Sequence, residues 1–153
     1  MIFEFVKSAG EKMMNFFTNE NSNDEKATKI NEFVNKLGFE ATNFSVTVND
    51  DVATLCGECA DAGIKEKMIV AVGNVEGIAK VEDKMTVTAG VTDAPVFYTV
   101  KSGDTLSKIS KNYYGDPMKY NAIFEANTPM LSHPDKIYPG QTLRIPGGNT
   151  TVA

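Results

Sequence analysis

Apolar residues recur at intervals of three and four positions at the start of this 153-residue chain, and they alternate with polar residues further on. Residues 2–17 show the first pattern, which predicts an amphipathic helix interrupted by a Ser-Ala-Gly sequence near its middle. Its polar face mixes Glu with Lys, which favours docking on the following domain over binding to a membrane surface. A polar segment then ends in a helix N-cap, Asn23 or Asp24, and the next helix runs to Leu37, where Gly38 ends it.

The following segment has the period of two that is typical of strands. Residues 44–48 and 52–56 alternate on either side of an Asn-Asp-Asp turn, which predicts a hairpin. A further helix over residues 60–72 and a third strand over residues 81–88 give the order α-β-β-α-β.

The C-terminal third has its own set of elements. A strand over residues 98–100 precedes a helix that Ser102 or Asp104 caps. An Asp-Pro sequence at Asp116 begins another helix, because the fixed φ of proline suits the first helical position. A closing strand over residues 142–145 pairs with the first and gives the order β-α-α-β.

These elements predict an α+β protein of two domains, because helices and strands alternate without the long βαβ series of a parallel sheet. The predicted parts are an N-terminal helix and loop packed on the first domain (1–23), an α-β-β-α-β domain (24–90), a linker (91–96), a β-α-α-β domain (97–146) and a disordered tail (147–153).

Charge and composition limit the functions that this chain can have. The net charge is −5, with the acidic excess before residue 91, so we expect no nucleic-acid partner and a preference for cations. The longest purely apolar run is Met68–Val72, far below the roughly 20 residues that a membrane-spanning helix needs. Charged residues interrupt the opening segment, which therefore lacks the apolar region of a signal peptide. We expect a cytoplasmic protein, and we expect it to be a monomer.

The sequence offers few groups for catalysis. Cys56 and Cys59 have a CxxC spacing, which is compatible with a redox pair or half of a zinc site but also with two small residues at a strand end. The single histidine, His133, lies far along the chain in a polar loop, and no Ser-His-Asp set is present. We expect a protein that is not an enzyme.

The first domain resembles the BON family. The resemblance rests on the helix, the hairpin whose second strand is closed by glycine (VATLCG, 52–57), the next helix, and the segment VGNVEGIAKV (72–81) before the last strand.

The second domain is similar to the LysM family over its whole length. YTVKSGDTL (98–106) stands at its front and IYPGQTLRIP (137–146) at its end. The resemblance implies a shallow groove for glycans that contain N-acetylglucosamine. The matching positions are Gly103, Asp104, Thr105 and Leu106 on one side, and Ile137, Tyr138 and Pro139 on the other. The same residues also fit turns and core, so a scaffold that has lost sugar binding, or a surface for a protein partner, remains an alternative.

The combination of a short N-terminal segment, a BON domain and a LysM domain resembles a family of bacterial cytoplasmic potassium-binding proteins. The matching segments are FVKSAGEKM (5–13), IVAVGNVEGI (69–78) and PDKIYPGQ (134–141). The resemblance implies K⁺ as the ligand, held by main-chain carbonyl oxygens. The matching positions are Val6, Ala9, Glu11, Gly73, Val75 and Ile78.

Physical chemistry is compatible with such a site. Hard cations take oxygen ligands, and rings of carbonyls can replace the hydration shell of K⁺. A helix end leaves carbonyls unpaired at the negative end of its dipole, and Gly73 and Gly77 allow the backbone to turn sharply. Taken alone, GNVEGI favours an ordinary helix-to-strand turn, and the resemblance is what favours the ion site. Since the ligands come from two distant segments, we expect binding to close the N-terminal segment onto the BON domain. The alternative is an envelope module that binds peptidoglycan through LysM and lipid through BON.

Overall fold

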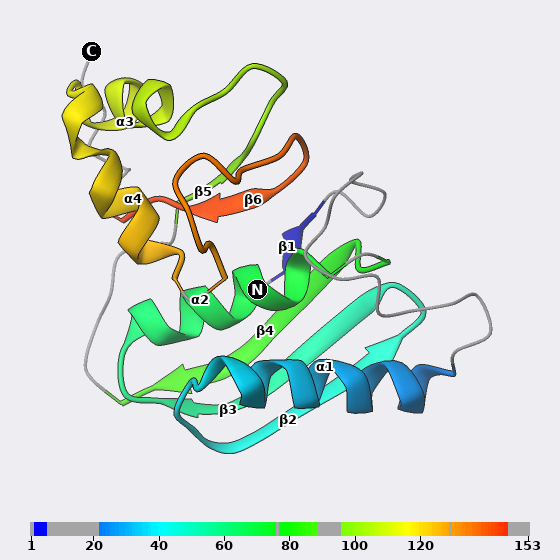
Figure 1. Ribbon diagram of the computed structural model, residues 1–153. Coiled ribbons are helices and arrows are strands. Elements are labelled where there is room, and N and C mark those ends of the chain that lie inside the picture. The colour runs from blue at the N-terminus through cyan, green and yellow to red at the C-terminus, as the bar shows by residue number, and fades with distance from the viewer. Residues whose placement is uncertain (1, 6–21, 76, 89–95, 129, 147–153) are drawn as a thin grey trace.

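The computed structural model describes residues 2–5, 22–75, 77–88, 96–128 and 130–146 (Figure 1). In these ranges the first part of the chain forms a four-stranded sheet with two helices, and the second part forms a two-stranded sheet with its own helices. The elements of the first part are β1 (Ile2–Glu4), α1 (Asn23–Leu37), β2 (Ala41–Asn49), β3 (Val52–Cys59), α2 (Ala62–Gly73) and β4 (Lys80–Val87). The predicted α+β class is confirmed, with the predicted order from α1 to β4.

The larger sheet has the strand order β1-β4-β3-β2. Strands β2 and β3 form the predicted hairpin, in which Asn49 pairs with Val52 across a two-residue turn. Strands β3 and β4 are parallel, and α2 supplies the crossover that a parallel pair requires. Both helices lie on the same face of the sheet (Figure 1). As a result, the loop from α2 to β4 lies at one end of the sheet, beside β1.

The N-terminal residues differ from the sequence prediction. Residues 2–4 form strand β1, which pairs antiparallel with β4, so a helix starting at residue 2 is wrong. The side chain of Phe3 packs against the core, whereas Ile2 is 58% exposed. Three residues are too few for the spacing of their apolar positions to distinguish a strand from a helix. Pairing with the edge of β4 makes them a strand. The remainder of the predicted helix, residues 6–17, lies outside the described residues.

Helix α1 begins at a different cap from the predicted Asn23 or Asp24. The N-cap is Ser22, whose side chain accepts a hydrogen bond from the N–H of Glu25 at 3.2 Å, and Glu25 reaches back to Ser22. This capping box satisfies two otherwise unpaired groups at once, which explains why it is preferred over a single Asn or Asp cap. Gly38 ends the helix in the left-handed conformation (φ 81°), as predicted.

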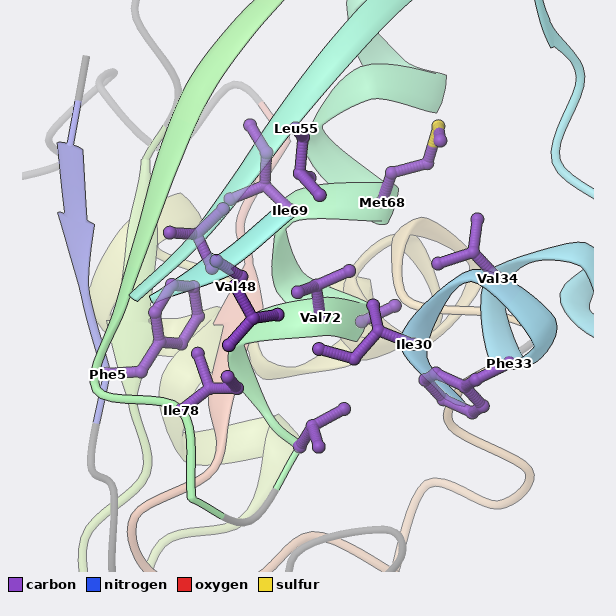
Figure 2. Packing of buried hydrophobic residues seen from close by; sticks show 14 of the residues in the cluster. Phe5, Ile30, Phe33, Val34, Val48, Leu55, Met68, Ile69, Val72 and Ile78 are labelled. Carbon is purple, nitrogen blue, oxygen red and sulfur yellow. The ribbon is translucent and has the colours of Figure 1, made fainter. Parts of the chain in front are cut away.

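Helix α2 is buried on more than one side. Its apolar residues Met68, Ile69 and Val72 are fully buried, and even Glu66 is only 9% exposed. The sheet covers one side of the helix, and strand β6 of the second domain lies against another (Figure 1). This double covering accounts for the continuous apolar run in the sequence. Figure 2 shows these side chains in one cluster with Phe5, Ile30 and Ile78.

The second domain contains β5 (Phe97–Thr99), α3 (Leu106–Tyr114), a 3₁₀ turn η1 (Pro117–Lys119), α4 (Tyr120–Ala126) and β6 (Thr142–Arg144). Strand β5 pairs antiparallel with β6, as predicted. The N-cap of α3 is Thr105, whose side chain accepts from the N–H of Lys108, and not Ser102 or Asp104. Asp116 caps the 3₁₀ turn and accepts from the N–H of Met118, so the helix that was predicted to start there begins as a tighter turn. Most of the predicted linker and the whole tail lie outside the described residues.

Candidate functional site

The last residue of α2 and the loop between α2 and β4 carry three of the six positions suggested for a cation. Helix α2 ends at Gly73, and the N–H of Val75 then donates to the carbonyl of Val72 at 3.1 Å. The N–H of Ile78 donates to the carbonyl of Val75, also at 3.1 Å. Two short turns therefore follow the helix directly, at the negative end of its dipole.

The side chains of Val75 and Ile78 in this loop point inward. Val75 is 1% exposed and Ile78 is fully buried, and both belong to the core cluster. With the side chains of Val75 and Ile78 committed to the core, these two residues can offer only main-chain groups to an ion. The carbonyl of Val75 already accepts one hydrogen bond, but a carbonyl oxygen has two lone pairs and can also contact a cation.

The two glycines of this segment have different roles. Gly77 has φ +100°, a conformation that side chains rarely adopt, so the turn requires glycine there. Gly73 lies in the last turn of α2 and has no positive φ. The expectation that Gly73 allows a sharp turn is therefore wrong. A Cβ added at Gly73 would lie 2.1 Å from the ring of Phe5, so this position is glycine because an aromatic ring occupies the space.

Phe5 brings the N-terminal strand to this loop. Its N–H donates to the carbonyl of Ala79 at 2.8 Å, and its side chain is 8% exposed. Val6 follows it directly in the sequence. The other candidate positions, Val6, Ala9 and Glu11, lie outside the described residues. The structure thus places Gly73 at the end of α2, Val75 and Ile78 in the loop that follows, and Phe5 next to Gly73.

The second domain touches the same loop through Asn74, a contact that sequence reasoning missed. The Asn74 side chain donates to the carbonyl of Thr142 at 2.8 Å and accepts from the N–H of Thr142 at 2.9 Å. Asn74 is 2% exposed. A polar residue directly after an apolar helix is the only sequence signal for this contact, and an Asn at a helix end is usually read as a cap.

Two further contacts join the domains. Arg144 Nε donates to Glu66 Oε1 at 2.8 Å, and both side chains are mostly buried. The rings of Phe3 and Phe97 lie with their centroids 5.0 Å apart. Strand β6 therefore rests on α2 through polar contacts, and the start of β5 rests on β1 through an aromatic pair.

The positions suggested for a glycan have several roles in the LysM domain. Leu106 is 2% exposed and belongs to the core. Asp104 accepts from the hydroxyl of Tyr98 at 2.5 Å and from the N–H of Lys101 at 2.8 Å, which closes the loop after β5.

The rest of that set lies nearer the surface or in turns. Thr105 caps α3, and Gly103 and Pro139 are exposed. Ile137 packs partly on the core, and the N–H of Tyr138 donates to the Gln141 side chain. Of the seven suggested positions, Gly103, Thr105 and Pro139 are exposed, Asp104, Ile137 and Tyr138 are partly buried, and Leu106 is buried.

The electrostatics of Tyr98 and Asp104 follow from their hydrogen bond. Burial, and then the bond to Asp104, raise the pKa of Tyr98 to about 12. The same bond is the main cause that lowers the pKa of Asp104, and the N–H of Lys101 adds to it. The pair is therefore a neutral phenol that donates to a carboxylate across the pH range in which proteins work.

The two cysteines lie on opposite faces of β3. Cys59 is 1% exposed, with its sulfur 3.8 Å from that of Met68, whereas Cys56 is half-buried. Residues three apart in a strand point to opposite sides, so this arrangement does not make a redox pair or a shared metal site. Burial, helped by the Asp83 carboxylate, raises the pKa of the Cys59 thiol. In the described part of the chain, no group of three or more His, Cys, Asp or Glu could hold a metal ion.

Comparison with known proteins places both domains. Residues 22–89 match the BON domain family, and residues 98–146 match the LysM domain family. Potassium binding protein Kbp from Escherichia coli O6:H1 (strain CFT073) is 51% identical over 146 residues, which cover 95% of this chain and 97% of that protein. This chain belongs to the Kbp family.

Two other relatives share only part of the chain. An uncharacterized protein from Deinococcus radiodurans is 60% identical over 50 residues, 33% of this chain and 19% of that protein. The uncharacterized protein YqbP from Bacillus subtilis (strain 168) is 39% identical over 62 residues, 35% of this chain and 28% of that protein. The Kbp relative therefore matches both domains together, whereas each of these two matches about a third of the chain. Among the residues that the structure describes, no helix combines the length and the apolar character needed to cross a bilayer.

Proposed function

We propose that this protein binds potassium ions and acts as a cytoplasmic ion sensor rather than as an enzyme. The observation that carries the proposal is the 51% identity to a protein named for potassium binding, over almost the full length of both chains. Agreement over the whole chain matters because the suggested ligands come from two segments, one at the N-terminus and one between α2 and β4.

The proposed site uses main-chain carbonyl oxygens of Gly73, Val75 and Ile78, together with those of Val6, Ala9 and Glu11. Three features of the described residues support it. The loop follows the C-terminus of α2, where the dipole is negative. The side chains of Val75 and Ile78 are committed to the core. Phe5 brings the N-terminal strand within hydrogen-bonding distance of the loop.

Binding at such a site would favour a closed arrangement of the N-terminal segment on the BON domain. A ligand shifts an equilibrium only as far as it prefers one state over the other. An ion held by two segments distant in sequence prefers the state in which both are in place. We therefore propose that potassium makes the protein more compact and more resistant to unfolding.

Melting temperatures in matched potassium, sodium and lithium chloride test this proposal. A ligand that binds only the folded state adds about 2.7 kcal/mol of stability at a concentration of 100 times its Kd. We expect the highest melting temperature in potassium and a smaller radius of gyration by X-ray scattering in the same salt. Equal melting temperatures in all three salts at equal ionic strength would remove the basis for the proposal.

A second candidate, glycan binding, rests on the match of residues 98–146 to the LysM family. The exposed backbone of Gly103 and the apolar surfaces of Ile137 and Pro139 are where the acetamide group of a sugar would lie. Cosedimentation with purified peptidoglycan sacculi tests this role, and recovery of the native protein in the cytoplasmic fraction tests the first. Binding to sacculi without any response to potassium would favour the second candidate.

A further inference from the structure

We propose that Phe5 is a positioning residue for the potassium site and that Gly73 is its receptor: the ring of Phe5 fits over the last turn of α2 only because residue 73 lacks a side chain. This inference rests on the potassium-binding function proposed above. It assigns a role to Phe5, which is not a suggested ligand. It also gives a reason why Gly73, a suggested ligand, has no side chain.

The contact between these two residues is unusually close. A Cβ built at Gly73 would lie 2.1 Å from two ring carbons of Phe5 and 2.3 Å from a third. Real Cβ atoms essentially never come closer than 3.0 Å to a neighbour, so even alanine would displace the ring. Because Gly73 is helical and has no positive φ, this contact is the reason that the structure gives for glycine at this position.

The ring of Phe5 has little freedom to move away. Its backbone N–H is bound to Ala79, and the strand before it pairs with β4 from Ile2 to Glu4. Its side chain is 8% exposed and belongs to the core cluster that also contains Val72 and Ile78. Figure 2 shows the ring pointing from the end of β1 into this cluster. A displaced ring would therefore disturb the packing of the loop or break the bond to Ala79.

The contact links both sides of the proposed site. On one side it fixes Gly73, the last residue of α2 and the first of the loop. On the other it fixes Phe5, which directly precedes Val6 in the sequence. Carbonyl oxygens around an ion lie at a narrow range of distances, so a displacement of an ångström in one segment matters. The ring thus holds the end of the N-terminal strand at a fixed distance from the last turn of α2, and we infer that this distance affects how well the proposed ligand set fits K⁺.

Three variants of the full chain and one control variant test this role by calorimetric titration with potassium and sodium chloride. Gly73→Ala should weaken potassium binding at least tenfold, since it drives the ring away, and should reduce the preference for potassium over sodium. Phe5→Leu should weaken binding only several-fold, because a smaller apolar side chain keeps the core filled. The double variant Phe5→Leu/Gly73→Ala should bind more tightly than Gly73→Ala alone, because leucine leaves room for the added methyl group.

Phe3→Leu is the matched control. Phe3 lies in β1, two residues before Phe5, packs on the same core and pairs with Phe97, whereas the atoms nearest to a Cβ built at Gly73 all belong to Phe5. It should lower the melting temperature measured without potassium and leave the potassium-to-sodium affinity ratio unchanged.

The outcomes separate this inference from the proposed function. Wild-type protein that does not bind potassium would refute the function itself. If the wild type binds, then a Gly73→Ala variant with unchanged affinity, or a double variant no better than Gly73→Ala, would overturn the role of Phe5. A Phe3→Leu variant that loses ion preference as strongly as Gly73→Ala would show a general effect of the core and would also overturn it.

Discussion

The side-chain amide of Asn74 makes two hydrogen bonds with the main chain of Thr142: it donates to the carbonyl and accepts from the N–H. The two residues are 68 positions apart in the sequence and belong to different domains. Asn74 stands between Gly73 and Val75 in the proposed ion loop, so the strand that ends the LysM domain is fixed to that loop.

Replacement of Asn74 should weaken the contact between the two domains and lower the free energy of unfolding. Asn74→Ala leaves a buried N–H and a buried carbonyl of Thr142 without the amide, and each such group costs about 1–3 kcal/mol. We expect a loss of about 3 kcal/mol in the free energy of unfolding, measured by urea denaturation. Asn121→Ala, at an exposed position on α4, is the control and should change it by less than about 0.5 kcal/mol. An equal and small effect of both changes would show that the contact does not hold the domains together.

The ion pair between Glu66 and Arg144 should behave as a buried pair. The two side chains are 11% and 16% exposed, so removal of one partner leaves a charge in a mostly dry interface. Arg144→Met alone should cost about 3 kcal/mol, while Glu66→Leu/Arg144→Met together should cost less than this single change. Chemical denaturation of the single and double variants gives the coupling energy.

The exposed pair of Glu82 and Lys84 serves as the control for that cycle. Its atoms are 3.5 Å apart, with side chains 32% and 59% exposed. Removal of either partner should change stability by less than about 1 kcal/mol because water screens the charges. Strictly additive effects at Glu66 and Arg144 would contradict the buried-pair account.

Removal of the Glu11 side chain should reduce the potassium affinity less than addition of a side chain at Gly73. Main-chain coordination predicts that Glu11→Ala keeps most of the potassium affinity. Gly73→Val should lose it, because the valine side chain collides with the ring of Phe5. Calorimetric titration of both variants distinguishes the two kinds of ligand. Equal losses would mean that the Glu11 carboxylate itself is a ligand.

The hydrogen bond from Tyr98 to Asp104 predicts a pH dependence at the alkaline end. The pKa of Tyr98 is raised from 10.0 to about 12 in the folded protein, so folding favours the neutral phenol. The resulting stability is fully present below pH 10 and is lost as the pH rises toward 12. Urea denaturation between pH 9 and 12 should show this decline, and ultraviolet absorbance should show the late ionisation of Tyr98.

Tyr98→Phe provides the matching test at the acid end. Because the phenol is the main cause of the lowered pKa of Asp104, its removal should raise that pKa toward its ordinary value, as followed by NMR of the carboxyl carbon. The stability that this carboxylate provides is present above its unfolded pKa and is lost as the pH falls through the folded one, so the variant should lose part of its acid resistance. Tyr120→Phe, on α4, is the control and should leave the Asp104 titration unchanged.

The sequence by itself determined the elements whose signals are local. The alternation on either side of the Asp50-Asp51 turn specified the hairpin, and Gly38 specified the end of α1, because these patterns depend on neighbours in the chain. The motifs at the two ends of the LysM domain and the GNVEGI segment located both domains and the loop that we propose for potassium. Even here local signals competed, and the capping box at Ser22 prevailed over Asn23 and Asp24 because it satisfies two groups at once.

Only the tertiary structure decided the contacts between distant segments. The spacing of residues 2–4 could not distinguish a strand from a helix, since the free edge of β4 made the choice. Nothing in the sequence near Gly73 indicates that the ring of Phe5 excludes a side chain there, and nothing near Asn74 indicates Thr142. Such contacts depend on where the folded chain places each group in space, and local periodicity carries no information about that.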